Sequence, residues 1–273
     1  MESELKGEAG AQNWKLTLAY DGSDFRGWQV QPGEVTIQGE LQAALGRICG
    51  ETPLPQGSGR TDAGVHALGQ VASFTLRAPI PENNLRRALN KTLPSSIRVM
   101  EAKQVAAGFH ARHSAVAKTY EYRIFRGQIC PPTVARFAHS CTWRLDRVLL
   151  EEAAAAVLGE HDFTSLAASD PDAARRVAEG EPELSAVREV FSSKWEHDRR
   201  GADELLVYQV RGNGFLHHMV RNLVGTMLEI GRGQFPAGSM AAVVAAKNRS
   251  VAGPTAPARG LFLDSVEYGG AEG

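Results

Sequence analysis

A run of small and polar residues between positions 57 and 66 carries the group in this chain that is best suited to chemistry. The run reads GSGRTDAGVH, so the carboxylate of Asp62 lies two positions after Arg60, among residues of little bulk. Glycines on both sides can adopt positive φ, which would let a large flat substrate approach the carboxylate closely. An aspartate in a glycine-rich turn also commonly bonds its own backbone. The residues alone therefore leave two interpretations open, a nucleophile and a structural turn.

A second polar group is predicted on one face of a helix over residues 216–230. At 100° per residue, the apolar side chains of this segment fall on one broad side. The opposite side carries His217, His218, Arg221, Asn222 and Gly225. Such a face is either solvated or functional. Paired histidines also occur in metal sites, but the chain has no His-Glu-x-x-His arrangement and no cysteine pair beside them, so we expect no zinc here.

The composition is that of a globular protein. Of 273 residues, 43% are hydrophobic and 22% are charged, which excludes wholesale disorder and leaves room for one large domain or two ordinary ones. No apolar run approaches the roughly 18 residues that suggest a membrane span, and the N-terminus lacks the apolar segment of a signal peptide. The three cysteines, Cys49, Cys130 and Cys141, lack metal-ligand spacing, and we expect free thiols in a reducing cytoplasm.

Charge is distributed unevenly along the chain. The formal net charge is −1, yet residues 57–126 hold eleven Lys and Arg against four Asp and Glu, so this segment carries +7 and the remainder −8. A basic segment that includes the Asp62 loop can bind phosphates while the acidic remainder keeps the protein soluble. The same charges are also compatible with several separate solvated faces, and the sequence leaves that choice open.

The elements that must position these groups follow an α+β order. Alternating apolar and polar residues predict strands over 14–20, 70–76 and 97–102, and a helix is predicted from Thr36 to a stop at Gly50. A second helix is predicted between Pro81 and Pro94. Strands and helices in this order, with few short crossovers, indicate helices layered on a largely antiparallel sheet.

The second half of the chain repeats this pattern. Its predicted strands cover 118–125, 186–195, 205–211 and 261–268, and its predicted helices cover 146–158, 216–230 and 239–247. Residues 168–183, rich in acidic residues, Ala, Gly and Pro, are expected to form a mobile loop, and the polar residues 1–13 are expected to be disordered. The boundary is expected near 104–114, which gives an N-terminal domain of 14–108 and a C-terminal domain of 109–270.

The run around Asp62 resembles the active-site motif of the tRNA pseudouridine synthase A (TruA) family, and further matches extend from Leu18 to Tyr268. The matching segments are YDG at 20–22, GWQ at 27–29, FHAR at 109–112, KTYEY at 118–122, GEHDFTS at 159–165, FLHHMVRN at 215–222 and GLFL at 260–263. The chain departs from the family pattern at 168–188. The family tends to have a basic Ser/Thr-Arg-Thr stretch there, and this chain has an acidic loop before Arg188, a difference that concerns local RNA contacts.

The resemblance implies the pseudouridine synthase fold: two α/β subdomains with joined, mainly antiparallel sheets, flanked by helices, and a basic central cleft. It implies a cytoplasmic homodimer that isomerises uridine to pseudouridine at positions 38–40 of the tRNA anticodon stem-loop. Because this reaction only rearranges bonds within one nucleotide, we expect no cofactor, no metal and no membrane partner. The alternative is an RNA-binding protein of the same fold without catalysis. A glycoside hydrolase would need a second carboxylate, and no partner for Asp62 stands out.

The resemblance also implies roles for four residues. Asp62 would be the nucleophile, attacking either C6 of the base or C1′ of the sugar, and Arg221 would pair with it. An arginine at salt-bridge distance keeps a carboxylate ionised where loss of water would raise its pKa, and its fork fixes the carboxylate's orientation. Tyr120 would stack on the target uracil. Arg60 would help to hold the target nucleotide outside the RNA helix. The preference among positions 38, 39 and 40 stays open.

Overall fold

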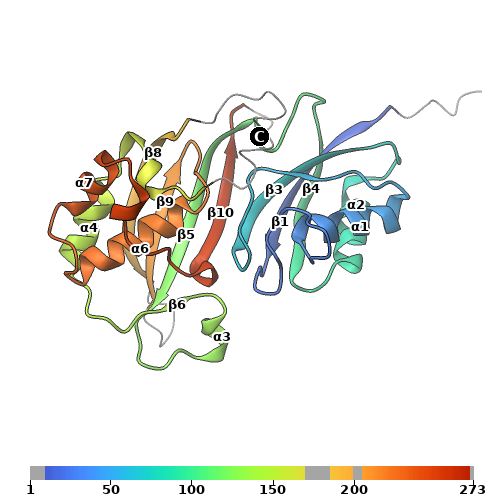
Figure 1. Cartoon of the computed structure of the whole chain (residues 1–273). Helices are drawn as coiled ribbons and strands as arrows, with labels where there is room; N and C mark the ends of the chain where they lie inside the picture. Colours follow the sequence, from blue (N-terminus) through green and yellow to red (C-terminus); the bar gives the residue numbers. More distant parts are fainter. Residues whose placement is uncertain (1–9, 170–184, 199–204, 271–273) are drawn as a thin grey trace, which may run out of the picture. The chain divides into compact units, whose positions relative to one another are not determined.

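Antiparallel strands with helices packed against them form both halves of the molecule, which the computed structural model describes over residues 10–169, 185–198 and 205–270 (Figure 1). Two compact units divide the chain: Met1–Val116 with Leu263–Gly273, and Ala117–Phe262. The α+β class predicted from the order of the elements is thereby confirmed. Within the described ranges, no helix combines the length and the apolar character needed to cross a bilayer.

The first unit is a sheet with two helices. Its elements are β1 (Gln12–Tyr20), α1 (Ile37–Cys49), β2 (Gln56–Gly57), β3 (His66–Leu76), α2 (Glu82–Thr92), β4 (Ile97–Val105) and most of β10 (Leu261–Tyr268). β1 pairs antiparallel with both β3 and β4, and β10 follows β3 in the sheet order. Along β1, the alternate residues Trp14, Leu16 and Leu18 are fully buried, so one face of this strand belongs to the core.

Local signals in the sequence set the ends of the helices in the first unit. The hydroxyl of Thr36 accepts a hydrogen bond from the Gly39 N–H at 3.2 Å and caps the start of α1. Gly50 ends this helix with a φ of 70°, a left-handed conformation that glycine adopts readily. α2 follows Pro81 and stops before Pro94, which cannot continue a helix. Both helices therefore occupy the predicted ranges.

The second unit is a sheet with helices at its side. Its elements are β5 (Ala115–Phe125), α3 (Pro132–Ala135), β6 (His139–Ser140), α4 (Arg147–Ala155), β7 (Gly159–Asp162), β8 (Val187–Asp198), β9 (Leu205–Gly212), α6 (Met219–Gly231) and α7 (Ser239–Ala245). β5, β9, β8 and β7 pair antiparallel in that order, and β6 runs parallel to β5. α4 packs against both α6 and β8. The short elements α3, β6 and β7 were not expected from the sequence.

Helix α6 is buried along nearly its whole length. It begins at Met219 rather than at the predicted Leu216, because His218 has a φ of 59° and interrupts the helical conformation. The predicted polar face of this helix is not simply exposed to solvent. Asn222 and Gly225 are buried, and a Cβ on Gly225 would lie 1.7 Å from the Pro254 carbonyl oxygen. Gly225 therefore permits a close backbone approach that no other residue would allow.

The compact units differ from the predicted division at residues 108 and 109. The first unit extends to Val116 and also includes the end of the chain, because the last part of β10 lies beside β3. The hydroxyl of Tyr268 donates to the Ala111 carbonyl at 2.8 Å, which ties the segment after β4 to the same unit.

Two predicted disordered or mobile segments fall largely outside the described residues. Residues 1–9 and 170–184 are not described, so the expectations for residues 1–13 and for the acidic loop at 168–183 concern mainly that part of the chain. Gln12 and Asn13 belong to β1, where they pair with Leu76 and Thr75.

Candidate functional site

The loop that carries Asp62 is a tight turn between β2 and β3. The Asp62 carbonyl accepts a hydrogen bond from the Val65 N–H at 3.1 Å, and Gly64, the third residue of this turn, has a φ of 78°. A positive φ at the third position is the requirement of a type II turn, and it explains a glycine there. Asp62 is half-buried, and Arg60 is exposed. The turn therefore presents the carboxylate at the surface of the first unit.

A second loop, between β1 and α1, packs directly against the Asp62 loop. The Trp28 N–H donates to the Thr61 carbonyl at 3.0 Å. Gly27 has a φ of 89°, and a Cβ on it would lie 2.6 Å from the Thr61 oxygen. A Cβ on Gly22 would lie 1.9 Å from the Val65 oxygen. The segments YDG and GWQ thus hold their glycines because the backbones of the two loops touch at these points.

Four buried side chains form a polar network beneath the same loop. The hydroxyl groups of Tyr20 and Thr61 are 2.8 Å apart, and Gln70 bonds both the Ser58 hydroxyl at 2.7 Å and the Gly59 carbonyl at 2.9 Å. All four are at most 6% exposed. Gln70 was not among the predicted site residues, although a polar residue in a mostly apolar strand is a signal that could have pointed to it.

Tyr120 lies on β5 in the second unit and is 8% exposed. Its ring meets the ring of Phe215 edge to face, with centroids 5.1 Å apart at 80°, an arrangement that fixes both rings. Tyr122, two residues along the strand, is fully buried and donates its hydroxyl to the Pro257 carbonyl at 2.9 Å. Burial raises the pKa of Tyr122, so its hydroxyl remains a donor.

Arg221 lies in the first turn of α6 and is half-buried. Its Nε donates to the Ala256 carbonyl at 2.8 Å, and the Ala256 N–H donates back to the Arg221 carbonyl at 3.1 Å. Just before the helix, the rings of His217 and His218 lie 4.0 Å apart, and His217 Nδ1 is 2.8 Å from the Ser169 carbonyl oxygen. The guanidinium therefore has a defined orientation within its own unit.

The four predicted site residues divide evenly between the two units. Asp62 and Arg60 share the turn between β2 and β3 in the first unit. In the second unit, Arg221 bonds the carbonyl of Ala256, and Tyr122, on the same strand as Tyr120, bonds the carbonyl of the next residue. The second unit thus brings the strand of Tyr120 and the helix of Arg221 to one connecting segment.

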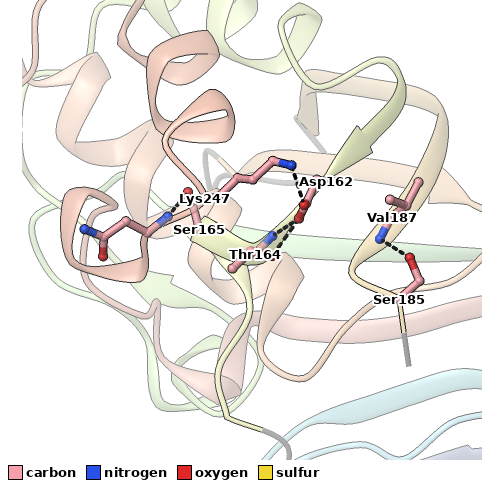
Figure 2. Close-up of polar contacts among 7 residues, drawn as sticks. Asp162, Thr164, Ser165, Ser185, Val187 and Lys247 are labelled. Carbon is pink, nitrogen blue, oxygen red and sulfur yellow. Dashed lines mark hydrogen bonds and ion pairs between the residues drawn. The ribbon is translucent and has the colours of Figure 1, made fainter. Parts of the chain in front are cut away.

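The matched segment GEHDFTS has a structural explanation in the second unit (Figure 2). Asp162, at the end of β7, accepts hydrogen bonds from the Thr164 N–H at 3.0 Å and the Thr164 hydroxyl at 2.6 Å. Lys247, after α7, lies 3.0 Å from the same carboxylate. Ser165 accepts a hydrogen bond from the Asn248 N–H at 2.8 Å. These contacts join the end of β7 to the segment that follows α7.

The Asp162 carboxylate should make a pH-dependent contribution to stability. The Thr164 hydroxyl and Lys247 lower the pKa of Asp162 from 3.8 to about 2. Its contribution is therefore complete above about pH 4 and is lost as the pH falls towards about 2. Asp162→Asn should lower the free energy of unfolding by about 1 kcal/mol near neutral pH. The loss is smaller than the pKa shift alone would give, because water screens this partly exposed carboxylate. Urea unfolding of both proteins at neutral pH and near pH 3 measures this difference, and an equal loss at both pH values would contradict it.

Comparisons with known proteins agree with the motifs. A family model described as tRNA pseudouridine synthase matches residues 17–114 and 153–269, ranges that contain Arg60, Asp62 and Arg221. The tRNA pseudouridine synthase A of Solibacter usitatus is 50% identical over 254 residues, covering 93% of this chain and 98% of that protein. The enzymes of the same name from Moorella thermoacetica and Bacillus pumilus are 43% and 41% identical over 256 residues, each covering 93% of this chain and 98% of the relative.

Proposed function

This chain belongs to the tRNA pseudouridine synthase family and is an isomerase acting on tRNA, and we propose that it converts uridine to pseudouridine at positions 38–40 of the anticodon stem-loop, with Asp62 as the nucleophile. The observation that carries this proposal is the Asp62 turn. A half-buried carboxylate lies on a glycine-rich turn that a second loop and a buried polar network hold in place. A rigid turn suits a reacting group, because a small displacement of that group lowers the reaction rate strongly.

The proposed reaction begins with attack by an Asp62 oxygen on C6 of the base or on C1′ of the sugar. The N1–C1′ bond breaks, the uracil turns within the site, and C5 forms the new bond to C1′. The proton on C5 is then lost and N1 gains a proton. An Asp62 oxygen attached to C1′ leaves as C5 bonds to C1′, and one attached to C6 leaves after that bond has formed. Atoms and electrons balance within one nucleotide, so the step sequence requires no cofactor and no metal.

The other three residues are proposed to act around this carboxylate. Arg221 pairs with Asp62 and balances its charge, and its bond to the Ala256 carbonyl supports this by orienting the guanidinium. Tyr120 stacks on the target uracil, and the edge contact with Phe215 keeps its ring rigid. Arg60 supports the extruded nucleotide from its exposed position beside Asp62.

We further propose a cytoplasmic homodimer that binds tRNA through a basic surface, without a metal or a membrane. The excess of eleven Lys and Arg over four Asp and Glu in residues 57–126 supports a phosphate-binding surface around the Asp62 loop.

Transcripts of one tRNA with a single uridine at position 38, 39 or 40 test the proposed target. We expect tritium release from C5-labelled uridine in at least one of these transcripts. A transcript without uridine at positions 38, 39 and 40 should release none. Activity should persist after exhaustive chelation, with the tRNA shown to remain folded. Binding without tritium release from any transcript would favour the alternative, an RNA-binding protein without catalysis.

A further inference from the structure

The backbone on both sides of Arg60 is tied to two buried side chains, Tyr20 at the end of β1 and Gln70 in β3. Gln70 is 0% exposed, and its Nε2 donates to the Gly59 carbonyl at 2.9 Å. The hydroxyl of Tyr20 lies 2.8 Å from Oγ1 of Thr61. These two bonds hold the residues immediately before and after Arg60, and therefore the backbone that leads into Asp62.

The orientation of the Gln70 amide follows from its hydrogen-bond partners. Its Oε1 accepts from the Val71 N–H at 3.1 Å, so its Nε2 must face the Gly59 carbonyl and the Tyr20 oxygen, the latter at 3.4 Å. The hydrogen bond between Tyr20 and Thr61 joins two hydroxyl groups, either of which can be the donor. Burial raises the pKa of Tyr20 to about 12, so its hydroxyl keeps its proton at any pH near neutrality.

We propose that Tyr20 and Gln70 are positioning residues, which hold Asp62 at the geometry that its attack on the nucleotide requires. Thr61 precedes Asp62 directly and is held at two points, through Oγ1 by Tyr20 and through its carbonyl by the Trp28 N–H at 3.0 Å. The far end of the turn is closed by the Asp62–Val65 hydrogen bond. Loss of the side-chain bonds would free one end of this turn only. The inference rests on the proposed role of Asp62 as nucleophile.

Tyr20→Phe removes the hydrogen bond to Thr61, and Gln70→Met removes the hydrogen bond to the Gly59 carbonyl. Both variants keep most of the side-chain volume. We expect the single-turnover rate constant, measured at saturating tRNA, to fall by about tenfold to 100-fold, because misplacement of a reacting group by about 1 Å has an effect of this size. The KM for tRNA should change by less than about threefold, since phosphate contacts dominate binding. A merely structural role would not produce a loss that is confined to the rate constant.

Tyr208→Phe in the second unit is the matched control. Tyr208 is fully buried, and its hydroxyl lies 2.8 Å from that of Ser193, so this variant loses the same kind of bond away from the Asp62 loop. It should keep the wild-type rate constant even with a comparable drop in melting temperature. An equal fall in the rate of Tyr208→Phe would reduce the effect to stability and overturn the inference.

The remaining outcomes separate this inference from the proposed function. Wild-type rates in Tyr20→Phe and Gln70→Met, with Asp62→Asn inactive in the same assay, would overturn the positioning role and leave the nucleophile in place. An active Asp62→Asn would overturn the nucleophile itself. If Tyr20→Phe does not fold, Thr61→Val removes the other partner of the same hydrogen bond and takes its place in the test.

Discussion

Replacing Asp62 with asparagine should lower turnover by on the order of 10⁴-fold or more, as removal of other covalent nucleophiles does. Asparagine keeps the size of the side chain and removes the charge that makes it a nucleophile. The affinity for tRNA should stay within about tenfold of the wild type, because Lys and Arg elsewhere provide the phosphate contacts. Affinity should also fall as salt is added, for the same reason.

Tritium release and filter binding, with one tRNA preparation at one ionic strength, measure both quantities for Asp62→Asn. Asp62→Ala is the companion variant, since alanine cannot return to aspartate by deamidation, and it should be equally inactive. If the asparagine variant forms pseudouridine at a tenth of the normal rate, Asp62 is not the nucleophile. If the wild type also fails to turn over while both proteins bind, the chain is an RNA-binding protein.

Substitution of Arg221 should have the second-largest effect. Arg221→Ala leaves the carboxylate of Asp62 without its proposed partner, and we expect kcat/KM to fall by about 100-fold, which is somewhat less than the loss for a fully buried pair because both residues are half-buried. Arg221→Lys should also be impaired, because an ammonium does not reproduce the two-pronged geometry of a guanidinium. It would also lose the present Nε bond to the Ala256 carbonyl.

Arg232→Lys is the matched control for this series. Arg232 follows the other end of α6, where it lies 2.9 Å from Glu229, and the variant makes the same chemical change outside the proposed site. It should retain normal turnover. Normal turnover in Arg221→Lys as well would show that the reaction needs no guanidinium at this position and would overturn the proposed pairing with Asp62.

Local signals in the sequence predicted the helices and most strands. They could not predict contacts between segments that lie far apart in the chain. Thr36 and Gly50 mark the ends of α1 because capping depends on residues within one turn. The start of α6 was misplaced because nothing local shows that His218 takes a φ of 59°. The short parallel pairing of β6 with β5 joins His139 to Ile124, and no periodic pattern marks two-residue strands.

The candidate site divides in the same way. The motif around Asp62 and the resemblance that it carries predicted the turn and its neighbours in sequence. The burial of Gln70 beneath the turn, and its bonds to Ser58 and Gly59, depend on the antiparallel pairing of β2 with β3. A polar residue in a mostly apolar strand does not show which partner it will meet, so this part of the site could not be predicted from the sequence.

The first unit can be completed only after the second unit has been synthesised, because its last strand, β10, follows the second unit in the chain. β10 leaves the ribosome after every other described strand, and until then β3 lacks the neighbour whose Asp264 carbonyl approaches Gly69. The nascent N-terminal unit therefore carries an unpaired strand edge, a surface that chaperones bind and that promotes aggregation. A chain truncated before Leu261 would contain every residue of the Asp62 turn and still lack a complete sheet beneath it. Termination before Leu261 would thus leave the first unit incomplete, although most of that unit is synthesised before the second.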